Sequence, residues 1–325
     1  MARELSTGRS RTIGVVFPLQ ASEVVMHSTY PGLLAGLGDA AEARGYALML
    51  VTSSSKDSET RFRDTIRRRR VDGVVLPAAG QRDRLLNEVL AARIPTVLIG
   101  HRARRPGVGW VDSEHDVATY DLTKLMLKGG RQDLVMLNGP ATVSACGLRA
   151  RGFWKAVEEA ASPVRWAAEL RVAFETDQAR AVAQSILSDE PRPGAIICGN
   201  DVIARGALQA AVQLGLRVPD DVALSGFDDR SFAATTSPAL TTVRMPLHRL
   251  GAKAAEMLIA MVEKKAVTNR HIVLPAEVVV RQTTPRSGGH PVDRAPVAAA
   301  PVQDTARALR TVRILGPAPA YLASR

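Results

Sequence analysis

The sequence contains few of the residues that build metal sites, disulfides or catalytic centres. It has two cysteines, Cys146 and Cys198, which form neither a metal-ligand spacing nor a disulfide framework. Its six histidines are scattered along the chain, and it carries no P-loop and no nucleophile paired with a histidine. We therefore expect no cofactor, no bound metal and no enzymatic activity.

Long apolar runs are also missing, so no membrane span is expected. The first residues, MARELSTGRSR, lack the apolar segment of a signal peptide, which favours a cytoplasmic protein. Aromatic residues make up only 4% of the chain, whereas alanine and valine are abundant, as is typical of helices packed on a parallel sheet. The formal charge of +11 favours contact with polyanions such as nucleic acid, and a merely solvated basic surface is the alternative.

Residues 195 to 229 contain a complete strand, helix and strand. The apolar run 195–198 is a short strand buried on both faces, and Asn200 is placed to cap the helix after it. A second strand, 222–225, leads into the turn that contains Asp228. Because parallel strands present their carboxyl ends at one edge of a sheet, Asn200 and Asp228 are expected to share that edge.

Strands and helices alternate through the rest of the chain, which predicts parallel sheets with right-handed crossovers. The helix at 61–70 is rich in arginine, and its exposed face is either solvated or a phosphate contact. Gly32, Gly36 and Gly38 fit a nicotinamide-binding pattern, but some fourteen residues separate them from the preceding strand. Helix packing is the favoured interpretation of these glycines.

Seven segments of the sequence resemble one family, in family order and spacing. They are RSRTIGVV (9–16), RRRVDGVVL (68–76), IPTVLIG (94–100), LNGPATVSACGLRARGF (137–153), GNDVIARGAL (199–208), LGLRVPDDVALSGFDD (214–229) and SPALTTVRMP (237–246). Together they resemble the LacI/GalR family of sugar-responsive bacterial transcription repressors over roughly residues 2 to 284.

The resemblance implies an α/β fold of two Rossmann-like lobes with parallel sheets, of the type I periplasmic-binding-protein kind, joined by three crossing strands. The expected divisions are a remnant hinge segment at 1–10, a first lobe at 11–108 plus about 245–271, and a second lobe at 109–244 plus about 272–284. Residues 285–325 are rich in Pro, Ala and Arg and read as a disordered tail, with a short helix near Leu309 as the alternative.

The function that the resemblance implies is a DNA-binding transcriptional regulator, a repressor, whose core binds a small metabolite such as a sugar and controls operator binding allosterically. Ala2, Arg3 and Leu5 match the end of the family's hinge helix, and Leu5 takes the place of a leucine that enters the minor groove. The family's helix-turn-helix, which should precede this point, is not in the sequence. A homodimer is expected, with a tetramer as the alternative. The competing function is a sugar-binding module that does not touch DNA.

Five residues match effector-contacting positions of the family: Tyr30, Arg149, Phe174, Asn200 and Asp228. Arginine, amide and carboxylate groups can grip ligand hydroxyls, and aromatic rings can stack on a sugar ring. Each has a structural alternative: Asn200 as a helix cap, Asp228 as a turn residue bonded to its own backbone, and the two aromatics as plain core. The sequence departs from the family pattern at Gly147, where a second arginine is common, and at Gly100, where several members carry an aspartate.

Overall fold

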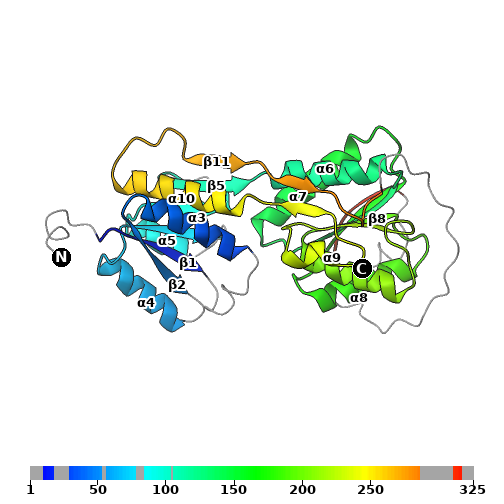
Figure 1. The fold of residues 1–325 in the computed structure, drawn as a ribbon, viewed down its shortest axis with the longest axis horizontal. Helices are drawn as coiled ribbons and strands as arrows, with labels where there is room; N and C mark the ends of the chain where they lie inside the picture. The colour runs from blue at the N-terminus through cyan, green and yellow to red at the C-terminus, as the bar shows by residue number, and fades with distance from the viewer. Residues whose placement is uncertain are drawn as a thin grey trace. The chain divides into compact units, whose positions relative to one another are not determined.

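The computed structural model describes residues 10–17, 29–52, 56–77, 84–103, 105–285 and 310–316. The chain folds into two compact units (Figure 1). Unit 1 comprises Met1–Glu114 and Pro246–Pro275, and unit 2 comprises His115–Met245 and Ala276–Arg325, so the chain passes from one unit to the other three times. Among the described residues, no helix is both long and apolar enough to cross a membrane.

Unit 1 is built on a six-stranded parallel sheet in the order β11-β5-β4-β3-β1-β2. The strands are β1 (Thr12–Phe17), β2 (Ala47–Thr52), β3 (Gly73–Pro77), β4 (Thr96–Ile99), β5 (Val108–Ser113) and β11 (His271–Leu274). The central strands β1, β3 and β4 are almost fully buried, as their continuous runs of Val, Ile and Leu predict. Residues 109–113 and 272–274, which the sequence analysis placed in the second lobe, instead belong to β5 and β11 of this sheet.

The helices of unit 1 are α3 (Tyr30–Glu42), α4 (Lys56–Arg67), α5 (Arg84–Ala91) and α10 (Leu247–Val262). Helices α3 and α10 lie side by side although they are far apart in sequence (Figure 1). A Cβ on Gly36 would lie 1.9 Å from the carbonyl oxygen of His248, and one on Gly251 would lie 2.1 Å from that of Leu33. A Cβ on Gly38 would meet only the Leu48 side chain, at 3.7 Å. Helix packing is therefore confirmed as the reason for Gly36, and it does not account for Gly38.

Unit 2 has a five-stranded sheet in the order β13-β7-β6-β8-β9, with β6 (Asp133–Asn138), β7 (Trp166–Arg171), β8 (Ala195–Cys198) and β9 (Ala223–Ser225) parallel to one another. One face packs on α6 (His115–Lys128) and α7 (Ser144–Glu158), and the other on α8 (Thr176–Ser188) and α9 (Asp201–Gln213). A short 3-10 helix, η1 (Ser231–Ala234), follows β9. Strands β10 (Thr242–Arg244) and β12 (Glu277–Val279) form a separate antiparallel pair.

The fifth strand of that sheet, β13 (Arg310–Leu315), corrects one expectation. These residues fall in the segment predicted to be disordered, or to form a short helix, yet they pair antiparallel with β7 from Arg310↔Arg171 to Leu315↔Ala167. The physical reason is local: TVRIL combines β-branched and apolar residues that fit a sheet edge, and Ile314 packs against the core of unit 2. Because the surrounding residues are rich in Pro and Ala, the strand propensity of these few residues was not recognised in the sequence.

Candidate functional site

The carboxyl ends of β6 to β9 form one rim of unit 2, which we call the unit 2 rim. Asn138 ends β6, Arg171 ends β7, Asn200 follows β8 and Asp228 follows β9. Parallel strands in neighbouring positions bring these side chains to the same edge, where open α/β sheets hold their ligands.

Arg149, on α7, reaches this rim with a side chain that is almost completely buried. One guanidinium nitrogen, Nη1, donates to the carbonyl oxygen of Gly199 at 2.5 Å, and Nη2 lies 3.5 Å from Oδ1 of Asp228. The guanidinium plane lies over the Phe227 ring at 3.8 Å from its centroid. Among the described residues, its buried Nε has no hydrogen-bond partner. A buried cation held mostly by neutral groups retains donor capacity for a further partner.

Asp228 sits in a backbone conformation that side-chain-bearing residues rarely adopt, with φ of 105°. Its carboxylate makes the 3.5 Å contact with Arg149 and, within the described part of the chain, no hydrogen bond to its own backbone. The next residue, Asp229, is instead bonded to Arg244 and Arg281, each at 2.7 Å. Of the two adjacent carboxylates, Asp229 forms the close ion pairs, and Asp228 keeps most of its capacity to accept hydrogen bonds.

Asn200 caps α9, because its Oδ1 accepts a hydrogen bond from the Ile203 backbone N–H at 3.0 Å. The capping interpretation is therefore confirmed. Its Nδ2, however, has no hydrogen-bond partner among the described residues, so the amide retains a donor beside its capping oxygen.

The two predicted aromatics behave differently from each other. Phe174 lies beyond the end of β7 and is 36% exposed, with its ring against Gly139, where a Cβ would lie 2.3 Å from the ring. Tyr30 begins α3 in unit 1, is buried, and packs its ring 4.5 Å from that of Phe17. Burial raises the pKa of Tyr30 above its ordinary value of 10.0. The structure thus places Arg149, Phe174, Asn200 and Asp228 on the unit 2 rim, whereas Tyr30 belongs to unit 1.

Ala2, Arg3 and Leu5, the predicted DNA-contacting residues, lie outside the described residues.

Two neighbours of Arg149 were not singled out from the sequence. The buried His115 ring stacks on Phe227 with centroids 5.4 Å apart, and its Nδ1 lies 3.4 Å from Arg149 Nη2. His115 precedes Arg149 by 34 positions and opens a different helix, so no local pattern connects them. Phe227 lies within the GFDD turn, where it could have been recognised as the ring beneath the arginine.

Behind the rim, Glu169 on β7 organises a buried polar network. It accepts hydrogen bonds from Asn138 Nδ2 at 3.2 Å and Trp154 Nε1 at 3.0 Å, and it pairs with Arg171 at 2.5 Å. Arg171 also donates to the carbonyl oxygen of Gly139 at 3.0 Å. These buried hydrogen bonds fix the positions of the strand ends, and the buried Nε of Arg171 is the one nitrogen of that guanidinium that has no partner among the described residues.

Asp201, the first residue of α9, is fully buried next to the same turn. The Thr242 hydroxyl donates to its Oδ1 at 2.5 Å and the Arg230 backbone N–H to its Oδ2 at 2.7 Å. Burial outweighs these bonds and raises the pKa of Asp201 to about 7, with the nearby Asp228 and Asp229 charges adding to the increase.

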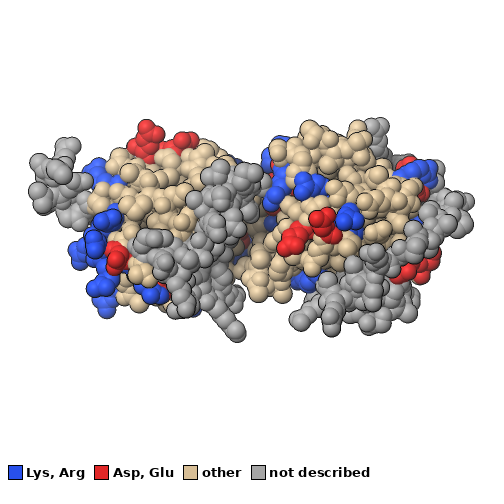
Figure 2. Space-filling model, turned by 90° about the horizontal axis from the view of Figure 1, so that it is seen from below, with Lys and Arg blue, Asp and Glu red and all other residues tan. Residues whose placement is uncertain are grey.

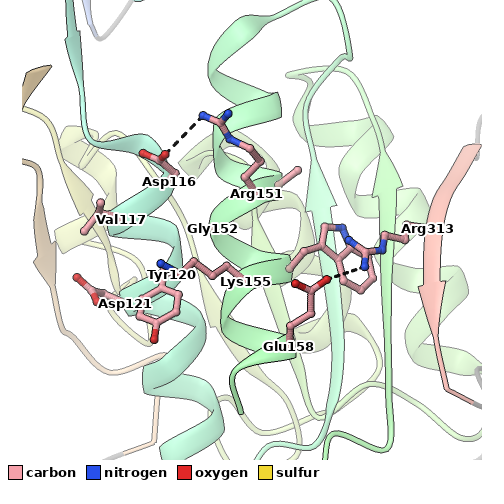
Figure 3. A pocket seen from close by; sticks show the side chains of 11 residues that line it. Asp116, Val117, Tyr120, Asp121, Arg151, Gly152, Lys155, Glu158 and Arg313 are labelled. Atoms are coloured by element: carbon pink, nitrogen blue, oxygen red, sulfur yellow. Dashed lines mark hydrogen bonds and ion pairs between the residues drawn. The ribbon is translucent and has the colours of Figure 1, made fainter.

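A separate groove lies on the outer surface of unit 2 between α6, α7 and β13, with a volume of about 660 Å³ (Figure 3). Ion pairs between Arg151 and Asp116 and between Arg313 and Glu158 cross it. It contains none of the predicted effector-binding residues. Among the described residues, no group of three or more His, Cys, Asp or Glu side chains could hold a metal ion.

Comparison with known proteins gives a consistent set of relatives. A family model described as a periplasmic binding protein-like domain matches residues 123–284. The HTH-type transcriptional repressor PurR of Vibrio parahaemolyticus is 30% identical over 289 residues, which cover 87% of this chain and 84% of that protein. The ribose operon repressor of Halalkalibacterium halodurans is 29% identical over 287 residues, covering 87% and 82%.

Solved structures show the same fold. A regulatory protein of the LacI family from Chloroflexus aggregans matches with a TM-score of 0.76 and 28% identity, over 85% of this chain and 99% of that one. A complex of the transcriptional regulator CelR with cellobiose matches with a TM-score of 0.77 over 87% and 88% of the two chains, and at 24% identity it shows the fold alone.

Proposed function

This chain belongs to the LacI/GalR family of transcription regulators, and on that premise we propose that its unit 2 rim binds a sugar or sugar derivative as effector. The family's regulators bind small-molecule effectors and operator DNA and are not enzymes. The finer assignment, which residues bind and what they bind, rests on the geometry of Arg149 and its neighbours.

The observation that carries the proposal is the unused hydrogen-bonding capacity at one rim. Arg149 offers donors, Asp228 offers acceptors, and Asn200 keeps a free amide donor, while Phe174 exposes 36% of its surface beside them. A pyranose or furanose ring has donor and acceptor hydroxyls at its edge and apolar C–H faces, so it matches this combination.

The charges at the rim favour a neutral ligand over a strongly anionic one. Arg149 lies 3.5 Å from the carboxylate of Asp228, and Arg171 is paired with Glu169. Each cation thus has a carboxylate beside it, so a dianion would meet repulsion as well as attraction. The name of one similar protein, a ribose operon repressor, agrees with this choice.

Operator DNA and a second copy of the chain are the other proposed partners. Ala2, Arg3 and Leu5 are the proposed minor-groove contacts. A homodimer is proposed because regulators of this family are expected to present the paired hinge segments of a dimer to DNA. Because the regulator acts on the chromosome, the proposal includes a cytoplasmic location.

Effector control follows from linkage. If the effector binds one of two conformational states more tightly, it shifts the population toward that state, and the affinity for operator changes by the same coupling free energy. We propose that Arg149, through its contacts with Gly199, Phe227 and Asp228, carries this differential affinity.

A thermal-shift screen of the purified chain against sugars, sugar phosphates and purines tests the proposal. A ligand at a hundred times its dissociation constant stabilises the folded state by about 2.7 kcal/mol, which is easily measured. We expect a sugar to raise the melting temperature of the wild type and of Arg151→Gln, an exposed neighbour on α7, but to have little effect on Asp228→Asn. Stabilisation by purines or phosphates alone would contradict the assignment to a neutral sugar.

A further inference from the structure

One edge of unit 1 carries a concentration of exposed cations. Strands β1, β3 and β4 begin at this edge, and helices α4, α5 and α10 end there. Its exposed basic residues, which we call the basic edge, are Arg11, Arg67, Arg68, Arg69, Arg70, Arg93 and Lys264. Four of them, Arg67, Arg69, Arg93 and Lys264, line a single hollow of about 530 Å³. Figure 2 shows a group of Lys and Arg side chains at the left-hand end of this unit.

Few negative charges offset this group. Asp72 lies in the same hollow, and its carboxylate accepts hydrogen bonds from the backbone N–H groups of Ser10 and Arg11. Glu263 is paired with Lys265 at 2.7 Å. Within the described part of the chain, none of the seven residues of the basic edge forms an ion pair. The edge therefore presents a positive field to solvent.

At three of these positions a cation occupies a backbone conformation that favours glycine. Arg69, Arg93 and Lys264 each lie two residues beyond a helix end, with φ of 50°, 54° and 57°. After α6 and α9 the same position is occupied by a left-handed glycine, Gly130 and Gly215, and after α3 the left-handed glycine, Gly45, lies one residue further on. A left-handed conformation costs a residue with a side chain roughly 1–2 kcal/mol, whereas a cation near a helix C-terminus regains about 0.3–1 kcal/mol.

We propose that the basic edge binds the phosphate backbone of duplex DNA. The inference deepens the proposed function, because it gives the core of this regulator a direct contact with its DNA partner. Ser10 is bonded to Asp72 at this edge, so residues 1–9, which include the proposed contacts Ala2, Arg3 and Leu5, join the chain here. Arginine and lysine contacts to phosphates add affinity without sequence preference, and each adds to the salt dependence of binding.

The test compares two triple variants of the whole chain that lose the same charge. The first is Arg69→Gly/Arg93→Gly/Lys264→Gly, in which glycine suits the backbone at every site. The matched control is Lys128→Gln/Arg151→Gln/Lys155→Gln, which removes three exposed cations from unit 2. Fluorescence anisotropy measures the binding of each protein to a labelled duplex of arbitrary sequence over a series of salt concentrations. Thermal melting of each protein serves as the check on folding.

We expect the glycine variant to melt at or above the wild-type temperature and to bind DNA with a shallower salt dependence. Three lost phosphate contacts reduce the slope of log K against log salt by about 2.7, which makes the affinity loss between about 50 and 200 mM salt about 40-fold smaller. The control variant should keep the wild-type slope.

Three results would overturn the proposal: an unchanged slope in the glycine variant, an equal loss in the control, or no binding of the wild type to DNA at low salt. Loss of binding to phosphatidylserine vesicles with an unchanged DNA slope would assign the surface to a membrane instead. The effector screen is independent of this assay, so a chain that binds no sugar but shows the slope difference would contradict the effector assignment alone.

Discussion

The buried carboxylate of Asp201 makes the stability of this protein depend on pH in a direction opposite to that of most carboxylates. Its pKa is raised by burial from 3.8 to about 7 in the folded protein. Between these two values the folded state holds a proton that the unfolded state has released, so the free energy of unfolding falls as pH rises. The difference between 3.8 and about 7 corresponds to about 4 kcal/mol as an upper limit, most of it lost between pH 4 and 7.

Urea unfolding monitored at about pH 5, 6, 7 and 8 measures this dependence. We expect the wild type to lose stability across the series and Asp201→Asn to give a flatter profile, because asparagine does not ionise. At pH 5, where the folded wild type holds its proton, the variant should be about as stable as the wild type, because the amide, like the protonated carboxyl group, can accept from the Arg230 N–H and donate to the Thr242 hydroxyl oxygen.

Asp221 provides the control for this experiment. Hydrogen bonding to Arg217 lowers its pKa, so its contribution to stability is fully present above pH 4 and is lost only as pH falls further. Asp221→Asn should therefore shift the whole profile between pH 5 and 8 downward without changing its slope. Parallel profiles for the wild type and Asp201→Asn would refute the reasoning about Asp201.

Two further predictions concern packing. Gly36→Ala should destabilise unit 1 by about 1–3 kcal/mol, because its Cβ would meet the His248 carbonyl oxygen at 1.9 Å. Gly38→Ala should be neutral or stabilising by up to about 1 kcal/mol. Urea unfolding midpoints distinguish the two variants, and equal midpoints would contradict the packing argument. Ile314→Ala should destabilise unit 2 by up to about 2 kcal/mol, because Ile314 packs against the core. Leu315→Ala, which truncates a side chain that is 37% exposed, should have little effect. An unchanged urea midpoint for Ile314→Ala would argue against the packing of β13 on the core.

The parts of the rim that follow from local sequence could be predicted. Asn200 and Asp228 lie two and three residues after the ends of short apolar strands of a parallel sheet, and that arrangement alone places them at one edge. The helix cap at Asn200 could also be predicted, because an asparagine before an apolar helical repeat indicates the N-terminus of a helix.

The parts that depend on distant partners could not be predicted. His115 and Glu169 acquire their roles only when separate helices and strands meet, and neither carries a distinctive pattern in its own neighbourhood. β13 was missed for a different reason: its six residues suit a strand, but only the open edge of β7 makes that strand stable. Likewise, the sequence alone could not show that the arginines at the end of α4 lie beside Arg93 and Lys264, because these residues come from three separate segments of the chain.

The measurement that tests the central claim most directly is a calorimetric titration of the sugar identified by the screen into the wild type, Arg149→Met and Arg151→Met. Loss of charge-assisted hydrogen bonds at Arg149 should weaken binding by about 2–3 kcal/mol, or roughly 30- to 150-fold, while Arg151→Met, whose arginine is 65% exposed, should bind as the wild type does. Equal affinity of a folded Arg149→Met variant would contradict the assignment of the effector site to the unit 2 rim.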